Sequence, residues 1–463
     1  MVFSSLVFLW LFLPVVISLY YVSQDKYRNL LLLIASLFFY AWGEPIYILV
    51  MIFSILANYI CGRFIVSENG KNKLALVIGI IVNLSLLGVF KYSGFVIENI
   101  NALTGLNLAI KPLSLPIGIS FYTFQSISYL VDIYRGVCEP QKNIIKMGLF
   151  ISFFPQLIAG PILKYYDIAA QIDHRQVTWS GFNYGATRFI IGLGKKVIIA
   201  NTMAVTADQI FALGQNEVTT LVAWIGLFAY YFQVYFDFSG YSDMAIGLGK
   251  MFGFRINENF NHPYTAVSIQ DLWRRWHISL ATWFKEYVYI PLGGSRHGTL
   301  MTYRNLMIVF FLTGLWHGAA WTFVLWGVWN GIFIILEKII PIEKILHWRL
   351  PQMIYSNFIF LCGLVFFRSE TMAQVCWYFH RLFEPYKIDV STAFLSREYI
   401  GAAVIGFLCC GFGTMLFRLL PLRESWKQGI VSVCTPVFCC VIAYFSVLML
   451  ASNTYNPFIY FRF

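Results

Sequence analysis

Two histidines, His317 and His277, have the residue type and surroundings best suited to chemistry in this chain. His317 lies in the run Gly314–Trp321, which reads GLWHGAAW, and a dozen residues on either side of it contain no lysine, arginine or carboxylate. A neutral imidazole in such apolar surroundings must still satisfy both ring nitrogens, and a titratable group in a lipid-compatible segment is a functional candidate. Because burial favours the neutral ring, which can accept a proton from a hydroxyl or a thiol, we predict that His317 is a general base.

The glycines on either side of His317 predict how the imidazole is held. Gly314 and Gly318 are four residues apart, a spacing that lets another helix backbone approach closely. Packing alone could account for these glycines. Together with the imidazole they suggest a base in a narrow gap between helices.

His277 lies in a more polar stretch, 257–297, where charged residues and tryptophans interleave as they do in amphipathic helices at a membrane interface. On helical spacing Trp273, His277, Leu280 and Phe284 share one face, while Arg274 and its neighbour Arg275 turn toward water or lipid headgroups. We therefore expect His277 to face inward from the edge of the bilayer, where it acts in catalysis or is a structural residue with water as a partner.

Arg274, Arg275 and Lys285 allow two interpretations. They either anchor the segment to anionic lipid or hold the phosphates of a cytoplasmic donor, a task that suits the planar donor set of arginine. The other residues assigned to donor or substrate binding are Trp273, Trp276, Asp237, Asp243, Gln156 and Trp316.

The two aspartates flank a serine-containing run, DFSGYSD. A Ser/His/Asp arrangement is conceivable there, but the run contains no Gly-x-Ser-x-Gly elbow. Asp237 and Asp243 are better interpreted as groups that orient a histidine or hold backbone and arginine groups.

Composition places these residues in a membrane protein. Of 463 residues 59% are hydrophobic and only 12% are charged, and apolar stretches recur from one end to the other. We expect one all-α polytopic domain, residues 1–463, with the catalytic motifs in 257–340. The predicted spans, about eleven to thirteen in number, are Val2–Val22, Leu30–Trp42, Ile46–Val66, Leu74–Phe90, Leu115–Asp132, Ile144–Ala159, Phe189–Phe211, Leu221–Phe238, two within Leu306–Ile340, Ile354–Phe367, Tyr399–Leu420 and Ile430–Leu450.

Several patterns narrow the function class. The prolines of Phe154–Pro161 exclude an uninterrupted helix and favour a re-entrant segment or a cavity lining. No internal repeat is visible, which weakens a transporter interpretation. The net charge of +11 is scattered over short loops, which argues against nucleic acid and, by the positive-inside rule, predicts an outside N-terminus. The nine cysteines form no Cys-x-x-Cys pair and have no histidine at ligand spacing, so we expect no metal site.

The motifs resemble those of the membrane-bound O-acyltransferase superfamily, most closely the bacterial branch that contains the membrane subunit of alginate O-acetylation. The resemblance rests on WRRWHISL at 273–280, YVYIPLGG at 287–294 and GLWHGA at 314–319, and it extends through PIGISFYTFQ at 116–125 to the closing FIYF at 458–461. It implies a ring of about eleven tilted transmembrane helices, with re-entrant and interfacial helices, around a central passage. It also implies that His317 matches the catalytic histidine of the family and His277 its second motif histidine.

The same resemblance implies an activity. Relatives transfer acetyl groups from a cytoplasmic donor, usually acetyl-CoA, to an exported or cell-envelope polysaccharide, often through a periplasmic esterase-like partner. We therefore expect an inner-membrane O-acetyltransferase with acetyl-CoA as substrate and no tightly bound cofactor. The alternatives are D-alanyl transfer from a carrier protein toward teichoic acid, a channel or transporter without chemistry, and a scaffold for the periplasmic partner.

Overall fold

The computed structural model describes residues 1–67, 70–109, 113–384, 394–419, 424–452 and 455–459. The chain forms two compact units, each assembled from separate stretches of sequence. The first comprises residues 1–189 and 244–257, and the second comprises residues 190–243 and 258–462. The closing motif residues Tyr460 and Phe461, and Leu420 at the end of one predicted span, lie outside the described residues.

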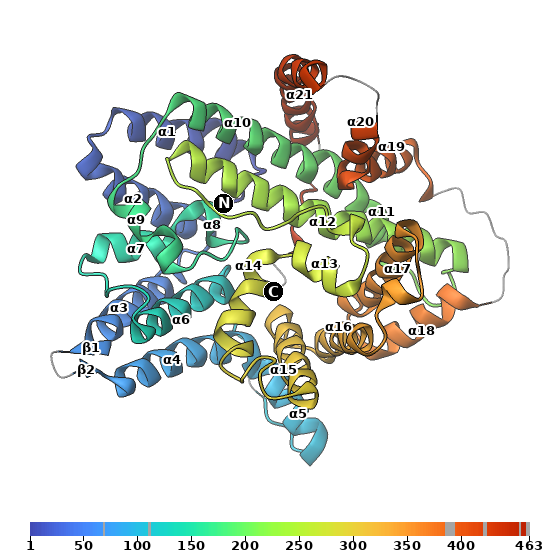
Figure 1. Cartoon of the computed structure of the whole chain (residues 1–463), viewed down its shortest axis with the longest axis horizontal. Coiled ribbons are helices and arrows are strands. Elements are labelled where there is room, and N and C mark those ends of the chain that lie inside the picture. Colours follow the sequence, from blue (N-terminus) through green and yellow to red (C-terminus); the bar gives the residue numbers. More distant parts are fainter. Residues whose placement is uncertain (68–69, 110–112, 385–393, 420–423, 453–454, 460–463) are drawn as a thin grey trace. The chain divides into compact units, whose positions relative to one another are not determined.

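The first unit is helical apart from one short antiparallel hairpin, in which Val66 pairs with Lys71. Its elements are η1 Phe8–Phe12, α1 Leu13–Val22, α2 Asp25–Gly43, α3 Ile48–Ile65, β1 Val66–Ser67, β2 Gly70–Lys71, α4 Lys73–Leu87, η2 Gly88–Tyr92, α5 Ser93–Thr104, α6 Ile119–Arg135, α7 Ile144–Ser152, α8 Phe154–Leu157, α9 Tyr165–Asp173 and most of α10 Trp179–Gly194. Figure 1 shows α3, α4 and α6 lying side by side.

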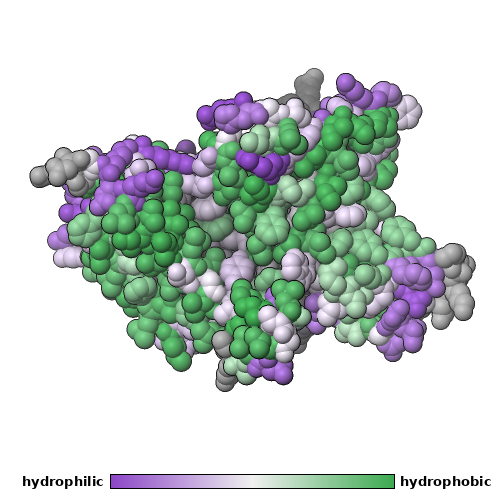
Figure 2. Space-filling view, turned by 90° about the horizontal axis from the view of Figure 1, so that it is seen from below, coloured by the Kyte–Doolittle hydropathy of each residue, from purple (hydrophilic) through white to green (hydrophobic). Residues whose placement is uncertain are grey.

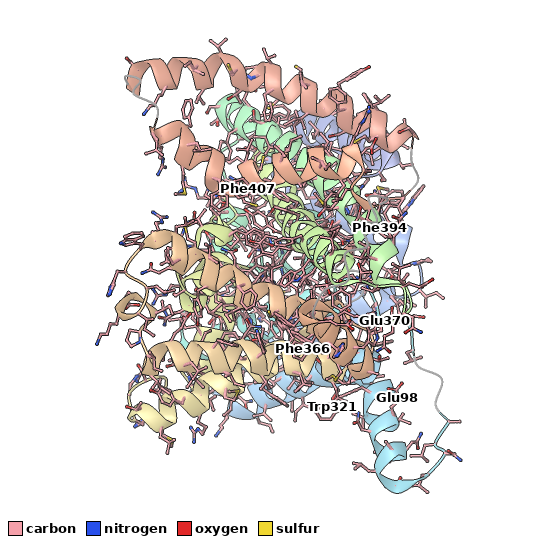
Figure 3. All side chains as sticks on the ribbon, turned by 90° about the vertical axis from the view of Figure 1, so that its right-hand side faces the viewer. Glu98, Trp321, Phe366, Glu370, Phe394 and Phe407 are labelled. Atoms are coloured by element: carbon pink, nitrogen blue, oxygen red, sulfur yellow. The ribbon has the colours of Figure 1, made fainter. Side chains whose placement is uncertain are left out.

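The second unit contains both histidines of interest. Its elements are η3 Lys195–Ala200, α11 Asn201–Phe211, most of α12 Thr220–Met251, η4 Pro263–Thr265, α13 Ile269–Arg275, α14 Ile278–Phe284, η5 Lys285–Tyr289, α15 Thr299–His317, α16 Trp321–Ile339, η6 Ile342–Lys344, α17 Arg349–Arg368, α18 Met372–Phe383, α19 Arg397–Phe407, η8 Leu408–Phe412, α20 Gly413–Leu419 and α21 Glu424–Ser452. Trp321 at the start of α16 and Glu370 just after α17 lie toward the same end of these two neighbouring helices (Figure 3), which therefore run antiparallel.

Eight helical stretches among the described residues are long and apolar enough to cross a membrane. They are Ile48–Ile65, Lys73–Thr104, Trp179–Phe211, Thr220–Met251, Trp321–Ile339, Arg349–Arg368, Arg397–Leu419 and Gly429–Ser452. Hydrophobic side chains cover much of the face seen in Figure 2, as expected for a surface that meets lipid tails. The all-α, polytopic membrane fold is thus confirmed.

Two predicted interruptions of the helices are confirmed. The Phe154–Pro161 stretch is not a continuous helix, because the four-residue helix α8 that opens it ends at Leu157. The long apolar run that was expected to hold two spans separates into α15 and α16 at Gly318–Ala320. The second interruption matters for function, because it leaves His317 at the very end of α15.

Glycines set the distance between α15 and α16. A Cβ added to Gly314 would meet the backbone oxygen of Phe323, and one added to Gly327 would meet the backbone oxygen of Phe310. The backbones of α15 and α16 are therefore in direct contact at Gly314 and again at Gly327, as small residues allow in membrane helices. The predicted close approach at Gly314 is confirmed.

Gly327→Ala should destabilise the protein, because the added methyl group overlaps the Phe310 carbonyl oxygen and forces the helices apart. We expect a loss of about 1–3 kcal/mol, typical of overpacking. The matched control is Gly401→Ala on α19, whose Cβ would have no heavy atom within 4 Å. The midpoint of thermal unfolding in one detergent should fall for the first variant alone, and equal midpoints would contradict the packing argument.

Candidate functional site

His317 is buried at the C-terminal end of α15, with 2% of its surface exposed. Its Nδ1 lies 2.7 Å from the backbone oxygen of Thr313, one helical turn earlier. A carbonyl oxygen can only accept, so Nδ1 carries the hydrogen and Nε2 carries the lone pair of the neutral ring. Rings of Trp316, Trp326 and Phe367 lie around the imidazole, with centroids 4.9, 4.7 and 5.5 Å from its own. The geometry leaves Nε2 as the basic nitrogen within an aromatic enclosure.

His277 is also buried, with 1% exposed, but it does not lie within a helix. It separates α13 from α14 and has left-handed backbone angles, φ 45° and ψ 53°. The expectation of one continuous helical face was wrong here, because a non-glycine residue in this conformation ends the helix. The expectation that His277 faces inward is confirmed, and Trp273, His277, Leu280 and Phe284 do line one common pocket.

A single side chain, Asn259, holds both the ring and the backbone at His277. Its Oδ1 lies 3.2 Å from His277 Nδ1 and accepts from the backbone N–H of Ser279 at 3.2 Å and from the Ser279 hydroxyl at 2.9 Å. Its Nδ2 donates to Ser242 Oγ at 3.1 Å. The backbone oxygen of Asn259 accepts from Ile278 N–H at 3.0 Å.

Burial lowers the pKa of the His277 imidazole well below its ordinary value, and the nearby His317 lowers it further. His277 is therefore neutral at physiological pH. The two imidazoles share Trp316, whose ring centroid lies 5.9 Å from that of His277 and 4.9 Å from that of His317. A positive charge on one histidine disfavours a charge on the other.

A pocket of about 350 Å³ in the second unit connects His277 with cationic side chains. Arg274, Lys285 and Lys338 line it and are exposed, which marks its open end, whereas His277 is buried. The remaining lining residues are Gln270, Trp273, Leu280, Ala281, Phe284, Tyr289, Leu306, Val309, Phe310, Thr313 and Ile334. The pocket thus combines a cationic mouth, largely apolar walls and a neutral imidazole. Its Thr313 is the residue whose carbonyl holds His317.

The other residues near α13 that were predicted to bind the donor do not all line the pocket. Trp273 lines the pocket and donates from Nε1 to Asn330 at 3.2 Å. Trp276 is buried, and its ring packs against rings of the second unit that include Phe260. Arg275 forms an ion pair with Asp271 at 2.9 Å and is not among the pocket-lining residues. Of the two arginines, Arg274 is the one placed to meet a ligand in the pocket.

The two aspartates bind lysines. Asp237 and Lys196 form a buried ion pair at 2.7 Å, with 1% and 3% of their side chains exposed. Asp237 also accepts from Ile459 N–H at 2.8 Å, and Lys196 donates to the carbonyl of Pro457, so this pair holds the segment 455–459. Asp243 pairs with Lys195 at 2.6 Å. The expectation that the aspartates hold backbone and cationic groups fits these contacts, although the cations are lysines.

Gln156 belongs to the first unit and follows the break between α7 and α8. It is fully buried, and its Nε2 donates to the carbonyl of Phe150 at 3.0 Å. Its assignment to donor binding stays a prediction.

Sequence reasoning missed three residues that shape the site. Lys338 follows an apolar run and gives no local signal that it reaches a pocket. Thr313 lies one helical turn before His317, but the sequence does not show that its carbonyl would accept from the imidazole. Asn259 stands in the run Asn259–Asn261 with no hint of its distant partner, since its contact with His277 is a product of the fold.

Comparison with known proteins agrees with this geometry. Residues 140–377 match the model of the membrane-bound O-acyltransferase family, MBOAT. The chain is 48% identical to a protein of Pseudomonas syringae pv. tomato named "Probable alginate O-acetylase AlgI", over 92% of this chain and 83% of that one. It is 40% identical to the Pseudomonas aeruginosa protein of the same name, over the full length of both. It is 38% identical to "Peptidoglycan O-acetyltransferase" of Helicobacter pylori, over 80% of this chain and 78% of that one.

Asp237→Asn should strongly destabilise the protein, because it leaves the Lys196 ammonium buried without a counter-ion. We expect a loss of about 3–5 kcal/mol for Asp237→Asn and also for Lys196→Met, and a loss in the double variant that is clearly smaller than their sum. The control Asp25→Asn removes an ion pair whose aspartate is 89% exposed, and it should cost no more than about 1 kcal/mol. Thermal unfolding midpoints measure all four. A stable Asp237→Asn variant with a raised KM for the donor would favour a binding role instead.

Proposed function

This chain belongs to the membrane-bound O-acyltransferase family, and we propose that it moves an acetyl group from a cytoplasmic thioester, acetyl-CoA, to a hydroxyl of an exported or cell-envelope polysaccharide. The observation that supports this proposal best is the pocket with a cationic mouth at Arg274, Lys285 and Lys338 and a neutral histidine at its buried end. Phosphate groups suit the mouth, and a largely apolar-walled pocket suits an acyl-bearing arm.

His317 is the general base in this proposal. Its Nε2 takes the proton of the acceptor hydroxyl while the oxygen attacks the thioester carbonyl. The C–O bond forms, the C–S bond breaks, and the leaving thiolate receives the proton that His317 holds. The Nδ1–H bond to Thr313 keeps Nε2 the basic nitrogen throughout, since that hydrogen stays on Nδ1 in both charge states.

His277 acts beside the donor. It lines the pocket and stays neutral, and its Nδ1 faces the accepting oxygen of Asn259, so Nε2 can accept a hydrogen bond from an N–H of the donor's amide-containing arm or share the proton without adding a second charge. The aromatic rings of Trp316, Trp326 and Phe367 exclude water from His317, which protects the thioester from hydrolysis and strengthens the electrostatic interactions of the site.

The setting of the reaction is part of the same proposal. About eleven membrane helices surround a passage in a bacterial inner membrane, the N-terminus lies outside, and an esterase-like periplasmic protein hands the acetyl group to the glycan. The names of the relatives support a polysaccharide acceptor, since they specify alginate and peptidoglycan. Purified protein in lipid nanodiscs, given acetyl-CoA, a glycan and the partner, tests the proposal by release of free CoA together with glycan acetylation. Activity with a D-alanyl carrier alone, or transport without CoA release, would refute it.

His317→Gln should abolish most of the acetyl transfer without loss of abundance, because the amide keeps the polar volume of the ring but cannot accept a proton. We expect kcat to fall on the order of 10²- to 10⁴-fold, the contribution of a positioned general base. His380→Gln is the control, since that side chain on α18 is 68% exposed. Full acetylation by the His317→Gln protein at normal abundance would remove the base assignment.

Charge removal at the pocket mouth should act on donor binding. Arg274→Gln, Lys285→Gln and Lys338→Gln each remove one cation that lines the pocket, and we expect KM for acetyl-CoA to rise severalfold with kcat nearly unchanged. The effect should shrink as ionic strength increases, because exposed charges are screened. Arg275→Gln is the matched control, since this neighbouring arginine pairs with Asp271 outside the pocket lining. Equal KM changes at 274 and 275 would indicate a general lipid-anchoring effect.

A further inference from the structure

His277 and His262 are the non-glycine residues with positive φ in the described part of the chain. Such a conformation is unfavourable for a residue with a Cβ atom and persists only where the surroundings enforce it. At His277 the left-handed backbone is held by hydrogen bonds from the segment 259–261, which begins 18 residues earlier in the sequence. Asn261 N–H donates to the Arg275 carbonyl at 2.9 Å, and the Asn259 carbonyl accepts from Ile278 N–H at 3.0 Å, so the segment 259–261 binds the chain on both sides of the histidine.

The side chain of Asn259 determines which ring nitrogen of His277 carries the hydrogen. The Ser279 backbone N–H can only donate, so the atom of Asn259 that faces it must be the amide oxygen. The same oxygen lies 3.2 Å from His277 Nδ1. The amide nitrogen is directed at Ser242 Oγ, which accepts, so the opposite orientation of the amide would lose the bond from Ser279. It follows that His277 carries its hydrogen on Nδ1 and its lone pair on Nε2.

We propose that Asn259 is the positioning residue of the site: its amide oxygen fixes the tautomer and the orientation of His277 without adding a charge beside the imidazole. This inference rests on the proposed acetyl transfer and adds a residue to it. A carboxylate at position 259 would make the same hydrogen bonds but would stabilise a positive imidazole. An amide orients the ring of His277 without adding a charge. In the proposed reaction the proton is then taken by Nε2 of His317.

The surroundings of His277 make this charge argument testable. The titratable group that acts on it is His317 of α15. The other described contacts of its ring are uncharged: Phe238 of α12, Asn259, Ser279 of α14 and Trp316 of α15. A carboxylate at 259 would add a negative charge 3.2 Å from the position of His277 Nδ1.

Asn259→Asp is the decisive variant. Its carboxylate can accept from His277 Nδ1–H, from Ser279 N–H and Oγ–H, and from the Ser242 hydroxyl, which can rotate to donate. We expect the acid limb of the kcat/KM profile for CoA release to move to higher pH by about 1–3 units, because an adjacent carboxylate favours the charged imidazole. Asn216→Asp, the same change at an exposed residue of the second unit outside the 259–261 segment, should leave the profile unchanged.

A second measurement does not require turnover. In the native protein His277 stays neutral when folded, whereas in the unfolded chain it takes a proton below about pH 6.5. The unfolded state then binds more protons, so thermal stability should fall as the pH is lowered from 7.5 to 5.5. In Asn259→Asp the folded state takes the proton as well, and this contribution to the acid loss should disappear. Asn216→Asp should keep the native slope.

Asn259→Leu separates positioning from charge. It removes the acceptor and adds no charge, so we expect kcat to fall at least about tenfold with an unshifted pH profile, as when the group that orients a functional histidine is lost. Asn259→Asp should regain activity above its displaced limb, which a merely structural asparagine would not explain. An Asn259→Asp protein with the native pH profile and the native stability slope would overturn the inference. Failure of the proposed function looks different: the unaltered protein would release no CoA.

Discussion

An imidazole can stay neutral inside an apolar protein only if its N–H has a fixed acceptor, and this constraint organises the second unit. Both histidines meet it in the same way, by donating from Nδ1 to an oxygen that can only accept there: the Thr313 carbonyl for His317 and the Asn259 amide for His277. The basic nitrogen is Nε2 in both rings. The close packing of α15 on α16 through Gly314 and Gly327, and the strained turn between α13 and α14, are the structural means by which these two nitrogens are held.

The sequence predicted those parts of the site that depend on local chemistry. A histidine far from any charge, between glycines at helix-packing spacing, predicted a buried imidazole beside a close helix contact, and both features are present at His317 and Gly314. Alternating aromatic and charged residues predicted that His277 turns inward and Arg274 outward. Such inferences succeed because burial and helix approach are set by residue type within one or two turns.

The rest of the site depends on contacts between distant parts of the chain. The helical pattern predicted one continuous helix through His277, because nothing in residues 273–284 forbids a helix. The observed break depends on backbone hydrogen bonds from residues 259–261, which the local sequence does not reveal. The role of a carboxylate is equally invisible until its partner is known. Asp237 could have oriented a histidine, but the adjacent Lys196 and the Ile459 N–H occupy it. Only the fold decides which of several compatible partners a polar group meets.

The division of labour between the two histidines follows from the cost of charge in an apolar interior. In the proposed reaction the proton that reaches His317 leaves a hydroxyl whose oxygen becomes negative or passes its charge to the thiolate, so positive and negative charge form together and the site gains no net charge. A proton on His277 is opposed by burial and by the nearby His317, so a charge there costs more free energy. In the proposed reaction, then, the developing anion forms beside His317, which acts as the base, while His277 stays neutral beside the donor.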